Sequence, residues 1–163
     1  MTVLKDEFRR AMGRFATGVT VITTRVGDDL HGMTANAVTS VSLEPLLLLV
    51  CVDKSADTHE ILAQADSFAV NILSVAQEEI SRSLATKKGG RATKLDGVAH
   101  VFGVTGAPLI DGAIAYLDCL SVRQYEGGDH TIFLGQVVDA GESDDGEPLV
   151  FYGGRYGRFE AGE

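Results

Sequence analysis

The chain has 163 residues, of which 45% are hydrophobic and 23% charged, and its formal net charge is −9. This length predicts one domain over residues 1–163, with a core that needs no metal or disulfide. The acidic balance argues against nucleic acid and against an anionic membrane surface, because both attract Lys and Arg. No apolar run is long enough to span a bilayer, and the N-terminus lacks an apolar signal core. We therefore expect a cytoplasmic protein.

An amphipathic helix is expected at the start of the chain. Its apolar residues recur at helical spacing and are Leu4, Phe8, Ala11, Met12 and Phe15. The β-branched run at 19–26 predicts a strand, and "GDDLHG" at 27–32 predicts a turn.

A stretch of neutral polar residues follows that turn. In an extended chain every second residue shares one face, which here would carry Thr34, Asn36, Val38, Ser40 and Ser42. Nothing from 32 to 43 is charged, so the pattern predicts a stripe of hydrogen-bonding groups. Pro45 interrupts the ladder, and "LLLLVCV" at 46–52 predicts a strand buried on both faces.

The segment "DKSADTH" at 53–59 lies where that strand gives way to a helix. Asp57 is the expected N-cap, with Glu60 completing a capping box. Lys54, Ser55 and Thr58 cluster at this helix start, where free N–H groups attract phosphate. The alternative is a capped helix with a solvated lysine.

The remaining elements are mostly strands joined by turns. We expect strands at 67–74, 113–126 and 130–141, and a short helix at 75–85. The closing segment at 148–160 follows an acidic loop. Because consecutive strands meet through turns and the chain has 19 glycines, the sequence predicts a mainly β antiparallel barrel with a few peripheral helices.

Three further segments could carry chemistry. His130 follows the tight turn "GGD" and is either a functional group at the barrel rim or a surface residue. Arg155 and Arg158 lie among aromatic residues in "FYGGRYGRF", which either stack on a planar ligand or pack into the core. The basic run "TKKGGR" at 86–91 is either a solvated loop or closes over an anion.

Other reactive groups are not apparent. Cys51 and Cys119 lie in apolar segments and are expected to be buried thiols, and the Cys and His spacing fits no zinc pattern, so we expect no metal. The sequence contains no GxSxG elbow, P-loop or GxGxxG after a strand. An enzyme with this sequence would therefore take its reactive group from a cofactor.

Taken in order, the segments resemble the short-chain flavin reductase family, the reductase components of two-component flavin monooxygenases. They are "FRRAMGRFATGVTVITT", "GMTANAVTSVSLEPLLLLVCVD", "SADTHEIL", "FAVNILS", "GAPLIDGAIAYLDC", "GDHTIFLGQVV" and "YGGRYGRF". The resemblance spans nearly the whole chain. It implies a split β-barrel that forms homodimers, binds FMN or FAD, oxidises NADH or NADPH, and passes reduced flavin to a separate oxygenase.

The same resemblance implies roles for particular residues. His130 would lie near the nicotinamide, and the C-terminal contact with the pyridine nucleotide would come from Tyr152, Arg155 and Tyr156. The groups around the flavin ring and ribityl chain would be Thr34, Ala35, Asn36, Ser40, Val41 and Ser42. The phosphate side would be bound by Asp53, Lys54, Ser55 and Thr58.

The chain departs from the family pattern at two places. Ala37-Val38 stands where Ser-Phe is frequent, and Leu46 stands where a second Pro is frequent. The first departure suggests looser flavin binding, so we expect the flavin to be a dissociable substrate. The alternative function is a non-catalytic flavin carrier or sensor with the same barrel, although "GDH" and "YGGRY" argue against it. An enzyme with a different electron donor also remains open.

Overall fold

The structure is a computed structural model that describes residues 2–85 and 94–162. Its helices are α1 (Lys5–Met12), α2 (Asp57–Gln64), the 3₁₀ turn η1 (Val75–Gln77) and α3 (Glu78–Leu84). Its strands are β1 (Thr17–Gly18), β2 (Thr20–Val26), β3 (Asp29–Ala35), β4 (Val38–Leu43), β5 (Leu46–Asp53), β6 (Ser67–Ile72), β7 (His100–Phe102), β8 (Pro108–Ile110), β9 (Ala115–Gly127), β10 (His130–Glu142), β11 (Leu149–Tyr152) and β12 (Arg155–Arg158).

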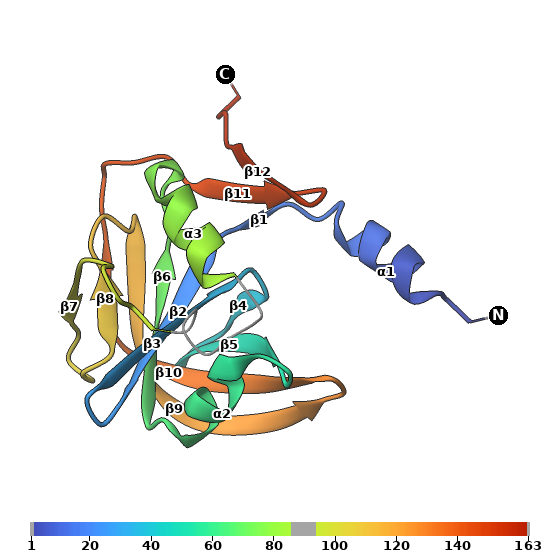
Figure 1. Ribbon diagram of the computed structural model, residues 1–163. Coiled ribbons are helices and arrows are strands. Elements are labelled where there is room, and N and C mark those ends of the chain that lie inside the picture. The colour runs from blue at the N-terminus through green and yellow to red at the C-terminus, as the bar shows by residue number, and fades with distance from the viewer. Residues whose placement is uncertain (1, 86–93, 163) are drawn as a thin grey trace.

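The main sheet has seven antiparallel strands in the order β3-β2-β6-β9-β10-β5-β4. It curls into a split barrel, with α2 and α3 packed on its outside (Figure 1). The two edge strands, β3 and β4, are consecutive in the chain and are joined by Asn36 and Ala37. The predicted antiparallel barrel with peripheral helices is therefore confirmed.

The barrel core is formed by side chains from several strands that point to one side. Its largest fully buried members include Ile22, Val50, Val52, Phe68, Val70 and Phe133. Gly135 is required at its position on β10, because a Cβ there would lie 2.5 Å from Cζ of Phe68. A second buried cluster under α3 contains Val19, Val21, Leu73, Leu84 and Leu149.

The expectation that the strand at 46–52 is buried on both faces is wrong. Leu48, Val50 and Val52 are buried, whereas the alternate residues Leu47, Leu49 and Cys51 are only partly buried. The strand thus has a single buried face, because its other face lies outside the barrel. Cys119 is fully buried as expected, but the Cys51 thiol is only half-buried.

Two smaller sheets complete the fold. β7 and β8 pair as an antiparallel hairpin within 98–112, where no strand is expected from the sequence. The sheet β1-β11-β12 joins the two ends of the chain, since the Gly153 N–H donates to the carbonyl of Gly13. Among the described residues, no helix is long and apolar enough to cross a membrane.

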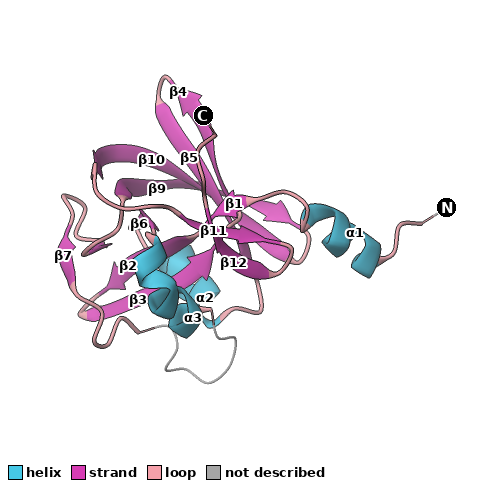
Figure 2. Ribbon diagram, turned by 90° about the horizontal axis from the view of Figure 1, so that it is seen from above, coloured by secondary structure: helices cyan, strands magenta, loops and turns pink. Residues whose placement is uncertain are grey.

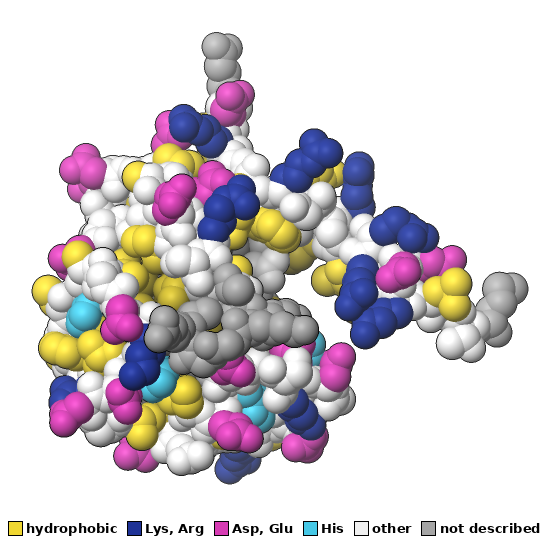
Figure 3. Space-filling model, viewed as in Figure 1, with side chains coloured by type: hydrophobic (Ala, Val, Ile, Leu, Met, Phe, Trp, Pro, Cys, Tyr) yellow, Lys and Arg dark blue, Asp and Glu magenta, His cyan; other side chains and the backbone are white. Residues whose placement is uncertain are grey.

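Helix α1 projects away from the barrel (Figures 1 and 2). The predicted helix is confirmed, but none of its residues is buried. Phe8 is 60% exposed and Phe15, just after the helix, is 70% exposed. Figure 3 shows Lys and Arg side chains gathered along this arm. The apolar face of α1 therefore has no partner within the described part of this chain.

Candidate functional site

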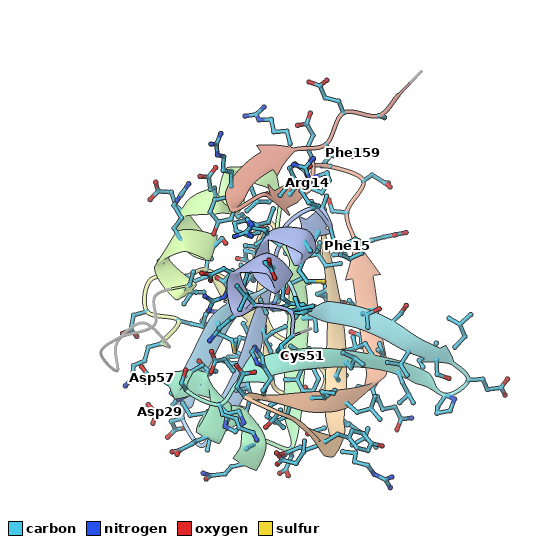
Figure 4. All side chains as sticks on the ribbon, turned by 90° about the vertical axis from the view of Figure 1, so that its right-hand side faces the viewer. Arg14, Phe15, Asp29, Cys51, Asp57 and Phe159 are labelled. Atoms are coloured by element: carbon cyan, nitrogen blue, oxygen red, sulfur yellow. The ribbon has the colours of Figure 1, made fainter. Side chains whose placement is uncertain are left out.

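A pocket of about 260 Å³ opens at the rim of the barrel, where β3 approaches β5. We call it the rim pocket. Figure 4 views this side of the molecule, with Cys51 and Asp57 labelled. Its lining combines small or apolar groups with neutral polar groups and two carboxylates. The lining residues are Met33, Thr34, Ala35, Asn36, Ala37, Cys51, Asp53, Ala56, Asp57, Thr58, Leu84, Ala85 and His130.

A larger apolar groove of about 750 Å³ continues from the rim pocket, and we call it the mouth groove. Asn36, Ala37 and Cys51 line both spaces, so they are connected. Its other walls include Met12, Phe15, Thr20, Val38, Ser40, Leu48, Ile72 and Leu117. Sites for small organic ligands are typically about 300–1,000 Å³ and mainly apolar, with a few polar groups. The two spaces together match that description.

A third depression, the hairpin groove, lies along β11 and β12 and measures about 440 Å³. Tyr152, Arg155, Tyr156 and Arg158 line it, together with Ala16 and Phe159. The predicted nicotinamide contacts Tyr152, Arg155 and Tyr156 are therefore gathered in one place. They lie apart from His130, which lines the rim pocket.

The predicted stripe of alternating polar side chains is wrong as a single strand. β3 ends at Ala35 and β4 begins at Val38, so Asn36 and Ala37 form a break between the two sheet edges. A register shift between Ser40 and Ser42 interrupts the alternation again. The physical reason is that the chain must cross from one edge of the sheet to the other at this point.

The break distributes the predicted flavin residues between two spaces. Thr34, Ala35 and Asn36 line the rim pocket, and Ser40 lines the mouth groove. Val41 and Ser42 lie farther along β4, where the Ser42 hydroxyl accepts a hydrogen bond from the N–H of Glu44. The Thr34 hydroxyl donates to the carbonyl of Ser81 at 2.7 Å, so this side chain holds the wall together.

The start of α2 forms another wall of the rim pocket. The expected cap is wrong, because Ala56 is the N-cap residue and Asp57 is the first residue of the helix. No side chain caps this helix. Asp53 instead organises the preceding turn, since its Oδ1 accepts hydrogen bonds from the N–H and hydroxyl of Ser55 at 2.8 and 2.7 Å. Thr58 is buried in the wall.

Lys54 lies beside the rim pocket but does not line it. Its Nζ pairs with the carboxylate of Glu126 at the end of β9. This pairing lowers the pKa of Glu126, first through the hydrogen bond and then through the lysine charge. The basic run at 86–91 lies outside the described residues. Lys94, which follows it in the chain, pairs with Asp29.

His130 begins β10 and lines the rim pocket together with Thr34. Its Nδ1 lies 2.7 Å from Oδ1 of Asp129. The hydrogen bond from His130 lowers the pKa of the Asp129 carboxyl, so this group is ionised near neutrality. An ionised carboxylate only accepts hydrogen bonds, so Nδ1 must be the donor.

Sequence reasoning missed several residues of this region. Asp129 could have been found, because a carboxylate directly before a candidate histidine is a possible orienting group. Ser81, Leu84 and Ala85 could not, because α3 meets the pocket only through tertiary packing. The half-buried Cys51 is also part of the lining, and burial raises the pKa of its thiol.

Comparison with known proteins identifies the family. Residues 12–160 match the flavin reductase-like domain family. This chain belongs to the flavin reductase-like domain family. An NADH-dependent FAD reductase of Streptomyces globisporus is 47% identical to this chain over 155 residues, which cover 94% of this chain and 85% of that protein.

A further relative and a solved structure are similar to this flavin reductase-like chain over nearly its whole length. The reductase component of a 4-nitrophenol 4-monooxygenase/4-nitrocatechol 2-monooxygenase from Rhodococcus opacus is 39% identical and covers 95% of this chain and 81% of that protein. A solved structure of the Streptomyces globisporus C-1027 NADH:FAD oxidoreductase, in complex with NAD and FAD fragments, superposes with a TM-score of 0.88 at 46% identity. That match covers 96% of this chain and 93% of the solved one.

Proposed function

We propose that this chain is an NADH-dependent flavin reductase that supplies reduced FMN or FAD to a separate monooxygenase. The observation that carries the proposal is the 47% identity to an NADH-dependent FAD reductase over nearly the whole chain. The rim pocket and mouth groove add a physical reason, since they offer an apolar space with a neutral polar edge. Either NADH or NADPH is chemically able to donate the hydride.

The residues of the rim pocket fit a flavin ring. The isoalloxazine is planar and apolar in its body, with hydrogen-bonding atoms along one edge. Ala35 and Ala37 are small, and the Asn36 side chain is exposed with no hydrogen-bond partner among the described residues. Asn36 can therefore bind the polar edge without imposing a charge. The ring would lie between this wall and the mouth groove, with Ser40, Val41 and Ser42 farther along.

The phosphate end of the flavin would lie at the start of α2. The first N–H groups of a helix have no partner within the helix and form an anion site with the helix dipole. Thr58 and the turn from Asp53 to Ser55 border this point. Because Asp53 and Asp57 add negative charge to the wall, a cation is needed to compensate the phosphate, and Lys54 is one that lies nearby.

The nicotinamide would meet the flavin ring near His130. When bound, the flavin supplies the electron acceptor for a hydride from the nicotinamide. The chain itself holds the two rings together and needs no nucleophile, since proximity and orientation lower the barrier. His130, held by Asp129, would orient the nicotinamide, while Tyr152 and Arg155 would contact the rest of the nucleotide.

We also propose that the protein acts as a cytoplasmic homodimer. The exposed apolar face of α1, with Leu4, Phe8 and Met12, needs a partner to leave water. A second copy fits, because α1 carries Lys5, Arg9 and Arg10 whereas the chain as a whole has a net charge of −9. Exposed Leu43 and Leu46 at the β4–β5 turn would extend the same interface.

The first experiment is NADH consumption by the purified protein, with and without added FMN. Consumption only after FMN is added would support a reductase that uses flavin as a dissociable substrate. Without consumption, the assay is repeated with FAD and with NADPH. Flavin binding without turnover in every combination would refute the reductase and support a carrier or sensor.

A further inference from the structure

Tyr156 is held on three sides. Its hydroxyl lies 2.7 Å from the hydroxyl of Ser81, a fully buried residue of α3. Its ring packs edge-on against Phe151, with ring centroids 5.5 Å apart. The guanidinium of Arg82 lies 4.6 Å from its ring centre. A tyrosine held in this way has little freedom to turn toward a ligand in the hairpin groove.

Ser81 also forms a hydrogen bond with Thr34, a residue in the wall of the rim pocket. Its carbonyl accepts the hydrogen bond from the Thr34 hydroxyl, while its own hydroxyl bonds to Tyr156. Leu84 and Ala85, at the end of the same helix, line the rim pocket. Thr34, Ser81 and Tyr156 therefore form a continuous chain of contacts from β3 through α3 to β12.

The two strands of the C-terminal hairpin are anchored differently. β11 is tied to the main body, since Leu149 is buried and donates its N–H to the carbonyl of Leu73. β12 pairs only with β11 among the described strands, so the hydrogen bond of Tyr156 fastens this outer strand to α3. The hairpin tip carries Tyr152, which is 43% exposed, and Arg155, which is also exposed. The placement of Arg155, on the same strand as Tyr156, thus depends on how Tyr156 is held.

We propose that Tyr156 and Ser81 are positioning residues, which fix the C-terminal hairpin, with Tyr152 and Arg155, relative to the rim pocket. The inference rests on the proposed reductase function. It changes the role of Tyr156 from a direct nucleotide contact to a support for the contacts beside it. The nucleotide-binding hairpin and the flavin pocket share α3 as their common support.

Kinetics of two matched variants test the proposal. Tyr156→Phe and Ser81→Ala remove the same hydrogen bond from its two ends, and Ser81→Ala keeps the carbonyl that binds Thr34. Each should raise the KM for NADH about two- to tenfold, the effect of one hydrogen bond, with kcat and flavin affinity nearly unchanged. The double variant should be no worse than either single one. Additive effects, or an equal loss of flavin affinity, would overturn the proposal.

A second measurement does not depend on turnover. Hydrogen exchange of the peptide covering 149–158 should become faster in both variants, because the hairpin loses an anchor. Tyr116→Phe is the control, since it removes a tyrosine hydroxyl bonded to Asp139 at 3.2 Å on the main sheet. If exchange in the hairpin is unchanged in Tyr156→Phe, the positioning role is wrong even if the protein is a reductase. Faster exchange in a protein without NADH turnover would instead refute only the proposed function.

Discussion

The Nδ1 atom of His130 lies 2.7 Å from Oδ1 of Asp129, so a carboxylate fixes which imidazole nitrogen carries the shared hydrogen. The Nε2 atom is then the nitrogen available to a ligand in the rim pocket. The pair is formed by neighbouring residues at the start of β10 and needs no other element to hold it. It gives the rim pocket an oriented polar group.

The first prediction concerns Asp129→Ala. Without its carboxylate partner His130 can rotate, so the KM for NADH should rise about two- to tenfold while flavin affinity stays unchanged. Because His130 lowers the pKa of Asp129, the interaction is present at neutral pH and is lost only as the pH falls through this lowered value. The difference between the variant and the wild type should therefore persist at mildly acidic pH. A KM unaffected by the substitution would remove Asp129 from the site.

The second prediction concerns His130→Ala. We expect kcat/KM for NADH to fall about tenfold or more, because the loss of an orienting hydrogen bond acts on the nicotinamide. Flavin affinity, measured by fluorescence quenching, should change little. His100→Ala is a suitable control, because His100 lies on β7, away from the pocket lining. Unchanged NADH kinetics in His130→Ala would exclude His130 from the nicotinamide site.

The third prediction uses the ion pair between Lys54 and Glu126. Lys54→Ala should weaken FMN binding about two- to tenfold, because a phosphate contact is lost. Glu126→Gln should strengthen it about two- to threefold, since Lys54 no longer has a competing carboxylate. Both dissociation constants can be measured by titration of flavin fluorescence. Identical affinities in the two variants would mean that Lys54 stays away from the phosphate.

The fourth prediction concerns thiol chemistry. Burial raises the pKa of Cys119 to about 12, so this thiol should resist alkylation in the native protein. Cys51 is half-buried and lines the rim pocket, so it should react slowly and be protected by added FMN or FAD. Mass spectrometry of the alkylated peptides distinguishes the two. Equal labelling of Cys51 with and without flavin would place the flavin elsewhere.

The fifth prediction concerns the arm. Phe8→Asp places a charge on the apolar face of α1, so it should shift a dimer toward monomer in sedimentation velocity. Asp6→Asn, on the same helix, is the control and should leave the assembly unchanged. A wild-type protein that sediments as a monomer would refute the proposed homodimer directly.

Much of the fold follows from local patterns in the sequence. The long alternating strands β9 and β10 and the helix α1 are visible in their periodicity. The end of β3 at Ala35 is not, because nothing in the local sequence signals that the chain crosses between two sheet edges there. The one-sided burial of 46–52 is equally hidden, since every residue in that run is apolar.

Some residues of the site can likewise be predicted from the local sequence, whereas contacts between residues far apart in the chain cannot. Thr34, Asn36 and Thr58 could be selected from their types and neighbours, and all three line the rim pocket. The pairing of Lys54 with Glu126 joins residues 72 positions apart, and Ser81 meets Tyr156 across 75 positions. Such contacts depend on how the elements pack, which no short stretch of sequence specifies.

The join between β3 and β4 at Asn36 and Ala37 affects how the flavin site of this barrel can evolve. The rim pocket and the mouth groove meet at this join, and the two strands that it connects, β3 and β4, stand at opposite ends of the sheet order with no ladder between them. Substitutions along this seam can widen or narrow the opening while the packing of Phe68 and Phe133 stays intact. A barrel closed by hydrogen bonds all round would lose stability with each such change. Preference for a smaller or larger flavin can therefore drift in evolution without a new fold.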